Sequence, residues 1–173
     1  VYDPQNFSIL TQKNYLPAET LDNQHISHRF VKDILQDGTQ LWVATNNGLN
    51  LLDIPTNTFE HFFYDKNQSN SLNNDVISSL YKDRVGMLWI GTEKGLDCFD
   101  PETEKFIHFE HNPKDKRSLG NDYIVSVAES KDGILWVGSE SGLNRLVRKK
   151  DGSPDFFVRY SIAPDDFNPG ERN

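Results

Sequence analysis

Two Asn-Asp pairs, at residues 74–75 and 121–122, lie 47 residues apart and offer the clearest potential for chemistry in this chain. Asp75 and Asp122 provide two carboxylates, which could act as the acid and the base of a glycan-cleaving enzyme if a fold placed them across one cleft. They could equally contact a bound ligand. They could also be structural, because Asn and Asp side chains close turns by bonding to nearby backbone groups.

The surroundings of these pairs extend the candidate site. His28 and Arg29 occupy the matching place in the first unit, and Tyr123 directly follows the second pair. We expect all of these positions to lead into an innermost strand, and so to line the mouth of a central channel. The predicted ligand-binding residues are Arg29, Asn74, Asp75, Asn121, Asp122 and Tyr123.

Histidine and cysteine offer weaker candidates. His61 and His108 are related by the same 47-residue step, and we expect both to face solvent from an outer strand. His25 and His28 lie in a loop where we find no acidic or cysteine partner at metal-ligand spacing, so no metal site is predicted. Cys98 stands where the preceding repeat has leucine, which marks it as a small core residue rather than a nucleophile. No glycine-rich phosphate loop or Ser-His-Asp set is present, and no cofactor is expected.

Charge excludes some classes of partner. The 173 residues contain 18 Lys and Arg against 26 Asp and Glu, for a net charge of −8. Nucleic acid and anionic membrane surfaces would both repel such a chain. The single cysteine excludes an internal disulfide. No apolar run is long enough to cross a bilayer, and the opening residues do not resemble a signal peptide.

Three tryptophans indicate the architecture that positions these residues. Trp42, Trp89 and Trp136 are evenly spaced by 47 residues, and the same step relates three glycines and the leucines that follow them: Gly48, Gly95 and Gly142; Leu49, Leu96 and Leu143. Short apolar runs separated by Gly, Pro, Asn and Asp are typical of strands joined by turns. A repeat of this length with several strands in each unit predicts β-propeller blades. The tryptophans are expected in the core between sheets, with each indole N–H bonded to a nearby turn.

The repeat divides the chain into blades of four antiparallel strands. We predict three full blades at residues 26–72, 73–119 and 120–162, with first strands at residues 30–35, 76–81 and 123–128. Residues 1–25 resemble the last hairpin of a preceding blade plus a linker, and residues 163–173 a tail or the start of another linker. The fold class is therefore all-β, as an incomplete arc of a β-propeller.

The turns after each tryptophan strand, at residues 45–48, 92–95 and 139–142, are expected on the same face as the Asn-Asp pairs. Their first and last residues are fixed as Thr or Ser and Gly, whereas the two middle residues vary. A variable surface on a rigid scaffold is typical of a binding face. Any solvent-exposed hairpin tip shows the same variation, so both explanations stand.

The text Asp-x-x-Gly-x-Leu-Trp-Ile-Gly-Thr-x-x-Gly-Leu at residues 83–96 resembles the two-component regulator propeller repeat. Ser-Leu-x-Asn-Asp, at residues 71–75 and 118–122, is similar to the interblade linker of that family. The third unit follows the pattern with a shifted turn, and the first departs from it with Ala44 in place of Gly. The resemblance extends over residues 1–162.

This resemblance implies a function in signal transduction. Such repeats build seven-bladed propellers in the periplasmic sensor region of hybrid sensor histidine kinases, so the chain would be an incomplete arc of a seven-bladed propeller. These kinases are inner-membrane proteins that respond to oligosaccharides through a phosphorelay. The chain would then be a carbohydrate-sensing piece, not itself an enzyme, whose kinase lies elsewhere in the polypeptide. Its implied partners are an oligosaccharide and neighbouring blades, or a second copy through self-association. Blades of a glycoside hydrolase and a protein-binding scaffold are the alternatives.

Overall fold

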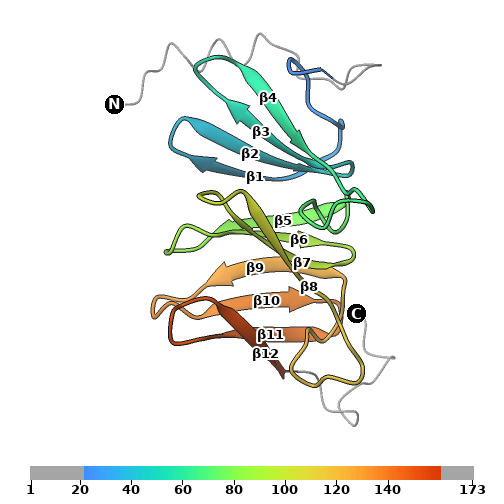
Figure 1. Ribbon diagram of the computed structural model, residues 1–173, viewed down its shortest axis with the longest axis vertical. Helices are drawn as coiled ribbons and strands as arrows, with labels where there is room; N and C mark the ends of the chain where they lie inside the picture. Colours follow the sequence, from blue (N-terminus) through green and yellow to red (C-terminus); the bar gives the residue numbers. More distant parts are fainter. Residues whose placement is uncertain (1–21, 161–173) are drawn as a thin grey trace, which may run out of the picture.

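The computed structural model describes residues 22–160, which form three four-stranded antiparallel sheets stacked one after another along the molecule (Figure 1). The first sheet contains β1 (Val31–Asp37), β2 (Gln40–Thr45), β3 (Leu49–Asp53) and β4 (Thr58–Phe62). The second contains β5 (Ile77–Lys82), β6 (Leu88–Thr92), β7 (Gly95–Asp100) and β8 (Lys105–Phe109). The third contains β9 (Ile124–Glu129), β10 (Leu135–Ser139), β11 (Gly142–Arg148) and β12 (Pro154–Tyr160).

Each sheet is a simple meander in which neighbouring strands follow one another in the chain. The first strands of successive sheets, β1, β5 and β9, contact one another. This convergence of the inner strands is the arrangement of propeller blades around an axis. The predicted all-β fold with four-stranded blades is confirmed, and the inner strands begin one residue later than expected. The predicted hairpin within residues 1–11 and the tail at 163–173 lie outside the described residues.

The tight turns between the first two strands of each sheet explain why Asp and Gly recur there in the sequence. Gly38, Gly86 and Gly133 have φ values of 60°, 92° and 85°, a region that favours glycine. In the second sheet the Asp83 carboxylate accepts hydrogen bonds from the backbone N–H groups of Val85 and Met87 at 3.1 and 2.9 Å. The aspartate therefore closes the turn that its glycine permits.

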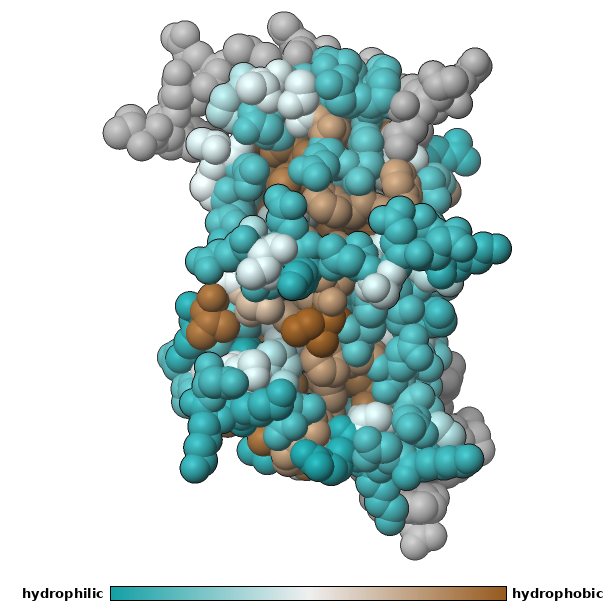
Figure 2. All heavy atoms as spheres, viewed as in Figure 1, coloured by the Kyte–Doolittle hydropathy of each residue, from teal (hydrophilic) through white to brown (hydrophobic). Residues whose placement is uncertain are grey.

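Two apolar interfaces hold the three sheets together. Trp42 lies between the first and second sheets, and its ring meets that of Phe99 edge-on at a centroid distance of 5.8 Å. Trp89 is completely buried between the second and third sheets. Seen from one face, apolar residues gather along the middle of the stack while hydrophilic residues occupy both margins, where the turns lie (Figure 2). The core prediction is thus confirmed for these two tryptophans.

Trp136 departs from the expectation. Its side chain is only half-buried, and it packs against Tyr160 at a centroid distance of 5.7 Å. The reason is the absence of a fourth sheet within residues 22–160. The same difference affects its neighbours: Leu96 in the second sheet is fully buried, whereas the equivalent Leu143 is 42% exposed.

Two further predictions about side chains are corrected. His25 does have an acidic partner, because its Nδ1 lies 2.7 Å from Asp22 Oδ1. His61 and His108 do not simply face solvent, since both nitrogens of each ring contact an oxygen atom. Cys98 is buried in the second interface as predicted, and burial raises the pKa of its thiol to about 12.

Candidate functional site

The candidate site is one edge of the stack, which we call the rim. It consists of the linkers at residues 28–30, 74–76 and 121–123 and the β2–β3, β6–β7 and β10–β11 turns at residues 45–48, 92–95 and 139–142. Backbone hydrogen bonds join each turn to the linker of its own sheet: Asn46 to Phe30, Glu93 to Val76, and Glu140 to Tyr123, at 3.1–3.2 Å. The turns and linkers therefore share one face, as expected.

The Asn-Asp pairs hold this rim together. The side chains of Asn74 and Asn121 accept hydrogen bonds from the backbone N–H two residues further on, at 2.8 and 2.7 Å. His28 Nδ1 takes the same place in the first sheet and accepts from Phe30 N at 3.2 Å. These are Asx-type turns, which support the structural interpretation of the asparagines.

The aspartates connect successive sheets. Asp75 Oδ1 accepts from Tyr64 N at 2.7 Å, and the Asp75 carbonyl accepts from Gly48 N at 2.7 Å. Asp122 bonds in the same two ways to the second sheet, through the backbone N–H groups of His111 and Gly95. A carboxylate oxygen in each pair is thus already engaged by the end of the preceding outer strand.

The glycines of the turns are required by this close approach. Gly48 has a φ of 95°, and a Cβ atom there would lie 2.7 Å from both the carbonyl oxygen of Phe62 and the ring of Phe63. Any side chain would force the turn away from the outer strand. The repeated glycine therefore allows the turn to lie close against the outer strand, while the two residues before it can vary.

Two of the predicted site residues leave their side chains open to solvent. Arg29 is exposed, and its guanidinium carbon lies 5.1 Å from the centroid of the Phe30 ring. Tyr123 is 38% exposed, and the negative charge of Glu93 raises the pKa of its phenol above 10.0, with Glu140 acting in the same direction. The other four predicted residues have partly buried side chains.

The β6–β7 turn adds residues that were not predicted as ligand contacts. Glu93 is exposed, and its negative charge acts on the phenol of Tyr123, whose pKa it raises. Lys94 turns to the other side, where its Nζ lies 5.4 Å from the ring centroid of Tyr64. One acidic and one basic side chain, each against an exposed tyrosine, form the most varied chemical surface of the rim. Tyr64 ends an outer-strand segment, and nothing in the repeat pattern points to it.

Such a surface suits a polyhydroxylated ligand. Tyrosine rings offer flat apolar faces with a polar edge, and the carboxylate and ammonium groups accept and donate hydrogen bonds respectively. Within residues 22–160 no group of three His, Cys, Asp or Glu side chains is arranged to hold a metal ion. The described part of the chain also has no helix able to cross a membrane.

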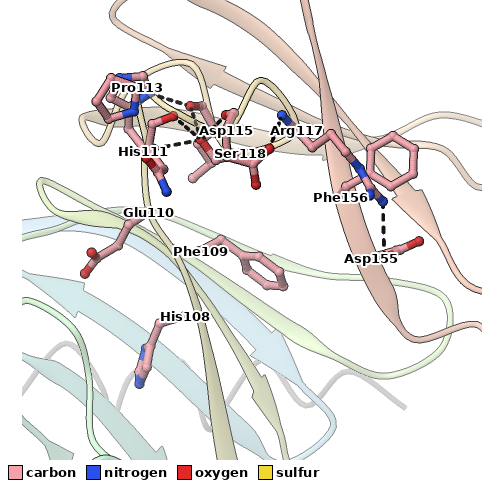
Figure 3. Close-up of a pocket in the computed structure, with 12 residues that line it drawn as sticks. His108, Phe109, Glu110, His111, Pro113, Asp115, Arg117, Ser118, Asp155 and Phe156 are labelled. Carbon is pink, nitrogen blue, oxygen red and sulfur yellow. Dashed lines mark hydrogen bonds and ion pairs between the residues drawn. The ribbon is translucent and has the colours of Figure 1, made fainter.

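A hollow outside the rim lies beside β8. It has a volume of about 690 Å³ and is enclosed by β8, the loop at residues 110–119 and the start of β12. Figure 3 shows Arg117 against the ring of Phe156, 4.1 Å from its centroid, with a 3.7 Å ion pair to Asp155. A smaller hollow of about 340 Å³ occupies the corresponding position beside β4. The hollow is therefore a recurring consequence of the way each linker loop arches over an outer strand.

The fold and the linked turns define the chain as a series of β-propeller blades. The family described as the two-component regulator propeller matches residues 71–94 and 118–141, which span the linker, the tryptophan strand and the rim turn of the second and third sheets. These two segments are therefore similar to two-component regulator propeller repeats. No curated protein matches the chain.

Solved structures agree with this assignment. The extracellular domain assigned to the hybrid two-component system BT3049 of B. thetaiotaomicron is 29% identical, with a TM-score of 0.70 over 80% of this chain. The corresponding domain of BT4673 from the same organism is 24% identical, with a TM-score of 0.58 over 79% of this chain, and shows the shared fold. The chain spans 19% and 16% of these two structures.

Proposed function

We propose that this chain is part of a ligand-sensing region of a hybrid two-component system, lying outside the cytoplasmic membrane, and that its rim recognises an oligosaccharide. The similarity to an extracellular domain of such a system supports the location and the role. The observation that carries the ligand class is the β6–β7 turn, which places Glu93 and Lys94 between two exposed tyrosines.

The signal passes from the rim to a kinase elsewhere in the polypeptide through the stacked sheets. Asp75 and Asp122 bond to the preceding sheet and lead directly into the next inner strand, so a shift of one rim turn changes the packing of two sheets. Packed interfaces switch between discrete arrangements rather than deforming gradually. Neighbouring blades of the same polypeptide would receive this change at the half-buried Trp136.

Calorimetric titration with a panel of plant and host oligosaccharides tests the proposal. Tyr64→Ala and Tyr123→Ala should each weaken binding by about tenfold, which corresponds to roughly 1.4 kcal/mol of lost contact. Val85→Ala is the control, because Val85 is 64% exposed but lies in the β5–β6 turn, at the opposite end of the strands from the rim turns. Equal losses in all three variants, or no binding by the unmodified protein, would contradict the assignment of the ligand to the rim.

A further inference from the structure

In each sheet, one pair of side chains on the last two strands binds the linker segment that precedes the first strand of that sheet. The pairs face each other in register: Asn50 and His61, Asp97 and His108, Asn144 and Arg159. In every pair the β3-, β7- or β11-strand member accepts a hydrogen bond from a linker N–H at 2.8 Å, given by Ser27, Asn73 and Gly120 respectively. We call each such pair a latch.

The outer-strand member of every latch is a basic side chain, His or Arg, whose nitrogen atoms contact backbone carbonyl oxygens of a loop. His61 Nε2 lies 2.9 Å from Asp22 O, and His108 Nε2 lies 3.2 Å from Ser69 O. In the third sheet Arg159 donates to Ser118 O and Asp115 O at 2.7 and 2.6 Å. Arginine is a permanent cation, so the third latch shows that a positive charge fits this position.

The second latch alone pairs its base with a carboxylate. Asp97 is completely buried, its Oδ2 accepts the Asn73 N–H, and its Oδ1 lies 2.8 Å from His108 Nδ1. Both ring nitrogens of His108 therefore face an acceptor, and only the protonated imidazolium has two N–H groups to donate. Loss of that proton leaves one of the two contacts without a hydrogen and removes the counter-ion of a buried carboxylate.

We propose that Asp97 and His108 form a pH-dependent latch, which holds the linker at residues 65–73 when His108 is protonated and loosens it when His108 becomes neutral. This inference goes beyond oligosaccharide recognition and does not depend on it.

The charges around His108 favour the protonated ring. The hydrogen bond with Asp97 raises the pKa of His108 above its ordinary 6.5, partial burial opposes the rise, and the charges of Asp97 and Glu110 add to it. Asp97 approaches from β7 and Glu110 follows β8. Lys94, in the β6–β7 turn, is the positive charge nearest to Glu110, with its Nζ 4.0 Å from Glu110 Oε1. The loop at residues 65–70 meets the ring through the carbonyl of Ser69.

The His108 side of the latch also borders the hollow beside β8, which His111, Asp115 and Arg117 line from the next linker loop. In Figure 3 His108 lies below Glu110 on the same strand, apart from the cluster around Ser118. The hollow leaves the imidazole 30% exposed, so protons reach it from solvent without unfolding of the sheet.

Loosening of this latch would reach the rim. The side chain of Asn73 donates to the carbonyl of Lys94 at 2.7 Å and to Glu110 Oε1 at 2.8 Å, and Lys94 Nζ lies 3.4 Å from Asn73 Oδ1. Movement of Asn73 therefore displaces the turn that carries Lys94. If the rim binds oligosaccharide as proposed, affinity would change with the protonation of His108; that statement alone rests on the proposed function.

The direction of the pH effect follows from the raised pKa. A group with a higher pKa in the folded protein contributes stability that is fully present below its unfolded pKa and is lost as the pH rises through the folded pKa. The latch is therefore closed below the ordinary histidine value of about 6.5 and opens as the pH rises through the raised pKa of His108.

Amide hydrogen exchange at the three linker N–H groups provides the test, with intrinsic exchange corrected at each pH. Between about pH 6 and pH 8.5 the protection factor of Asn73 should fall severalfold, because the stability contributed by the raised pKa of His108 is lost as the ring deprotonates. Gly120, whose latch contains Arg159, is the internal control and should keep its protection or follow global stability only. Titration of the His108 ring by NMR should give a midpoint above 6.5.

Two variants separate the latch from a merely structural contact. His108→Arg installs the permanent cation of the third sheet, so it should keep the Asn73 amide protected and abolish the pH-dependent fall. Asp97→Asn reproduces the neutral acceptor of the first sheet and should lower the NMR midpoint of His108. An Asn73 profile identical in the unmodified protein and in His108→Arg, or a His108 midpoint at or below 6.5, would overturn the proposal.

Discussion

Trp89 Nε1 donates a hydrogen bond to Asp83 Oδ2 at 2.8 Å, and both side chains are completely buried. The same oxygen accepts from Arg148 Nη2 at 2.6 Å, so the aspartate of one turn satisfies an indole of its own sheet and a guanidinium of the next sheet. Asp83, a residue of the repeated turn, therefore links the second sheet to the third through its carboxylate. Of the three tryptophans, all within residues 22–160, Trp89 is the one whose indole N–H makes the expected hydrogen bond to a turn.

Trp89 and Trp136 lie at equivalent positions of the repeat, but they should contribute differently to the free energy of unfolding. Trp89→Ala removes a buried ring and leaves Asp83 facing a cavity, and should cost about 3–5 kcal/mol of unfolding free energy. Trp136→Ala, at a half-buried ring, should cost roughly 1–2 kcal/mol because less apolar surface is lost. Chemical denaturation measures both. A change below about 1 kcal/mol for Trp89→Ala would contradict the core role.

Gly91 should not tolerate a methyl group, although its backbone conformation is ordinary. A Cβ atom there would lie 2.5 Å from Ser79 Oγ and 2.7 Å from Ile124 Cγ2 of the third sheet. Gly91→Ala should destabilise the protein by about 1–3 kcal/mol through overpacking. Gly138→Ala is the control: its nearest obstacle is the rotatable Ser126 hydroxyl, so a smaller loss of unfolding free energy is expected. Equal effects would show that the interface yields more easily than these distances indicate.

The aspartates of the linkers should affect stability rather than catalysis. Asp75→Ala and Asp122→Ala each remove the acceptor of an outer-strand N–H, and each should cost about 1–3 kcal/mol. Reducing-sugar assays after prolonged incubation with plant and host glycans should detect no product from the unmodified protein. Turnover that disappears in both Asp75→Asn and Asp122→Asn would instead favour a glycoside hydrolase.

The face of the third sheet that carries Trp136 should promote self-association. Leu143, Tyr160 and Val125 are 42%, 47% and 53% exposed there, and contiguous apolar surface promotes association. Sedimentation at micromolar concentration should show self-association unless a neighbouring blade covers this face. Leu143→Lys should reduce it, whereas Val85→Lys, at a 64% exposed valine in the β5–β6 turn, should not. A monomer at all concentrations would mean that this face is sealed in another way.

The repeat made much of the fold predictable. Even spacing of the tryptophans and glycines identifies equivalent positions, and equivalent positions adopt equivalent strands and turns. Local turn chemistry was predictable for the same reason: Asn74 and Asn121 do close Asx turns. Cys98 was placed in the core because it replaces a leucine of the preceding unit.

The contacts between units were much less predictable. A repeat identifies which residues correspond, but not which residues meet across neighbouring sheets or linkers. His108 was assigned to solvent because its strand is outermost, yet Asp97 and a loop 39 residues away engage its ring. The approach of Lys94 to Tyr64 depends on the linker folding back over β4, and Trp136 is half-buried because exposure depends on the next sheet rather than on its own.

The double attachment of Asp75 has a mechanical consequence. Its carbonyl is fixed to the turn at Gly48, its carboxylate to the end of the outer segment at Tyr64, and the chain then enters β5 two residues later. One short peptide thus joins two neighbouring segments at the rim edge of the first sheet, the β2–β3 turn and the end of the outer segment, to the innermost strand of the second sheet. A displacement of the rim turn at Gly48 is therefore shared by two neighbouring sheets. The sheets should move relative to one another as units, rather than unfold locally at their loops.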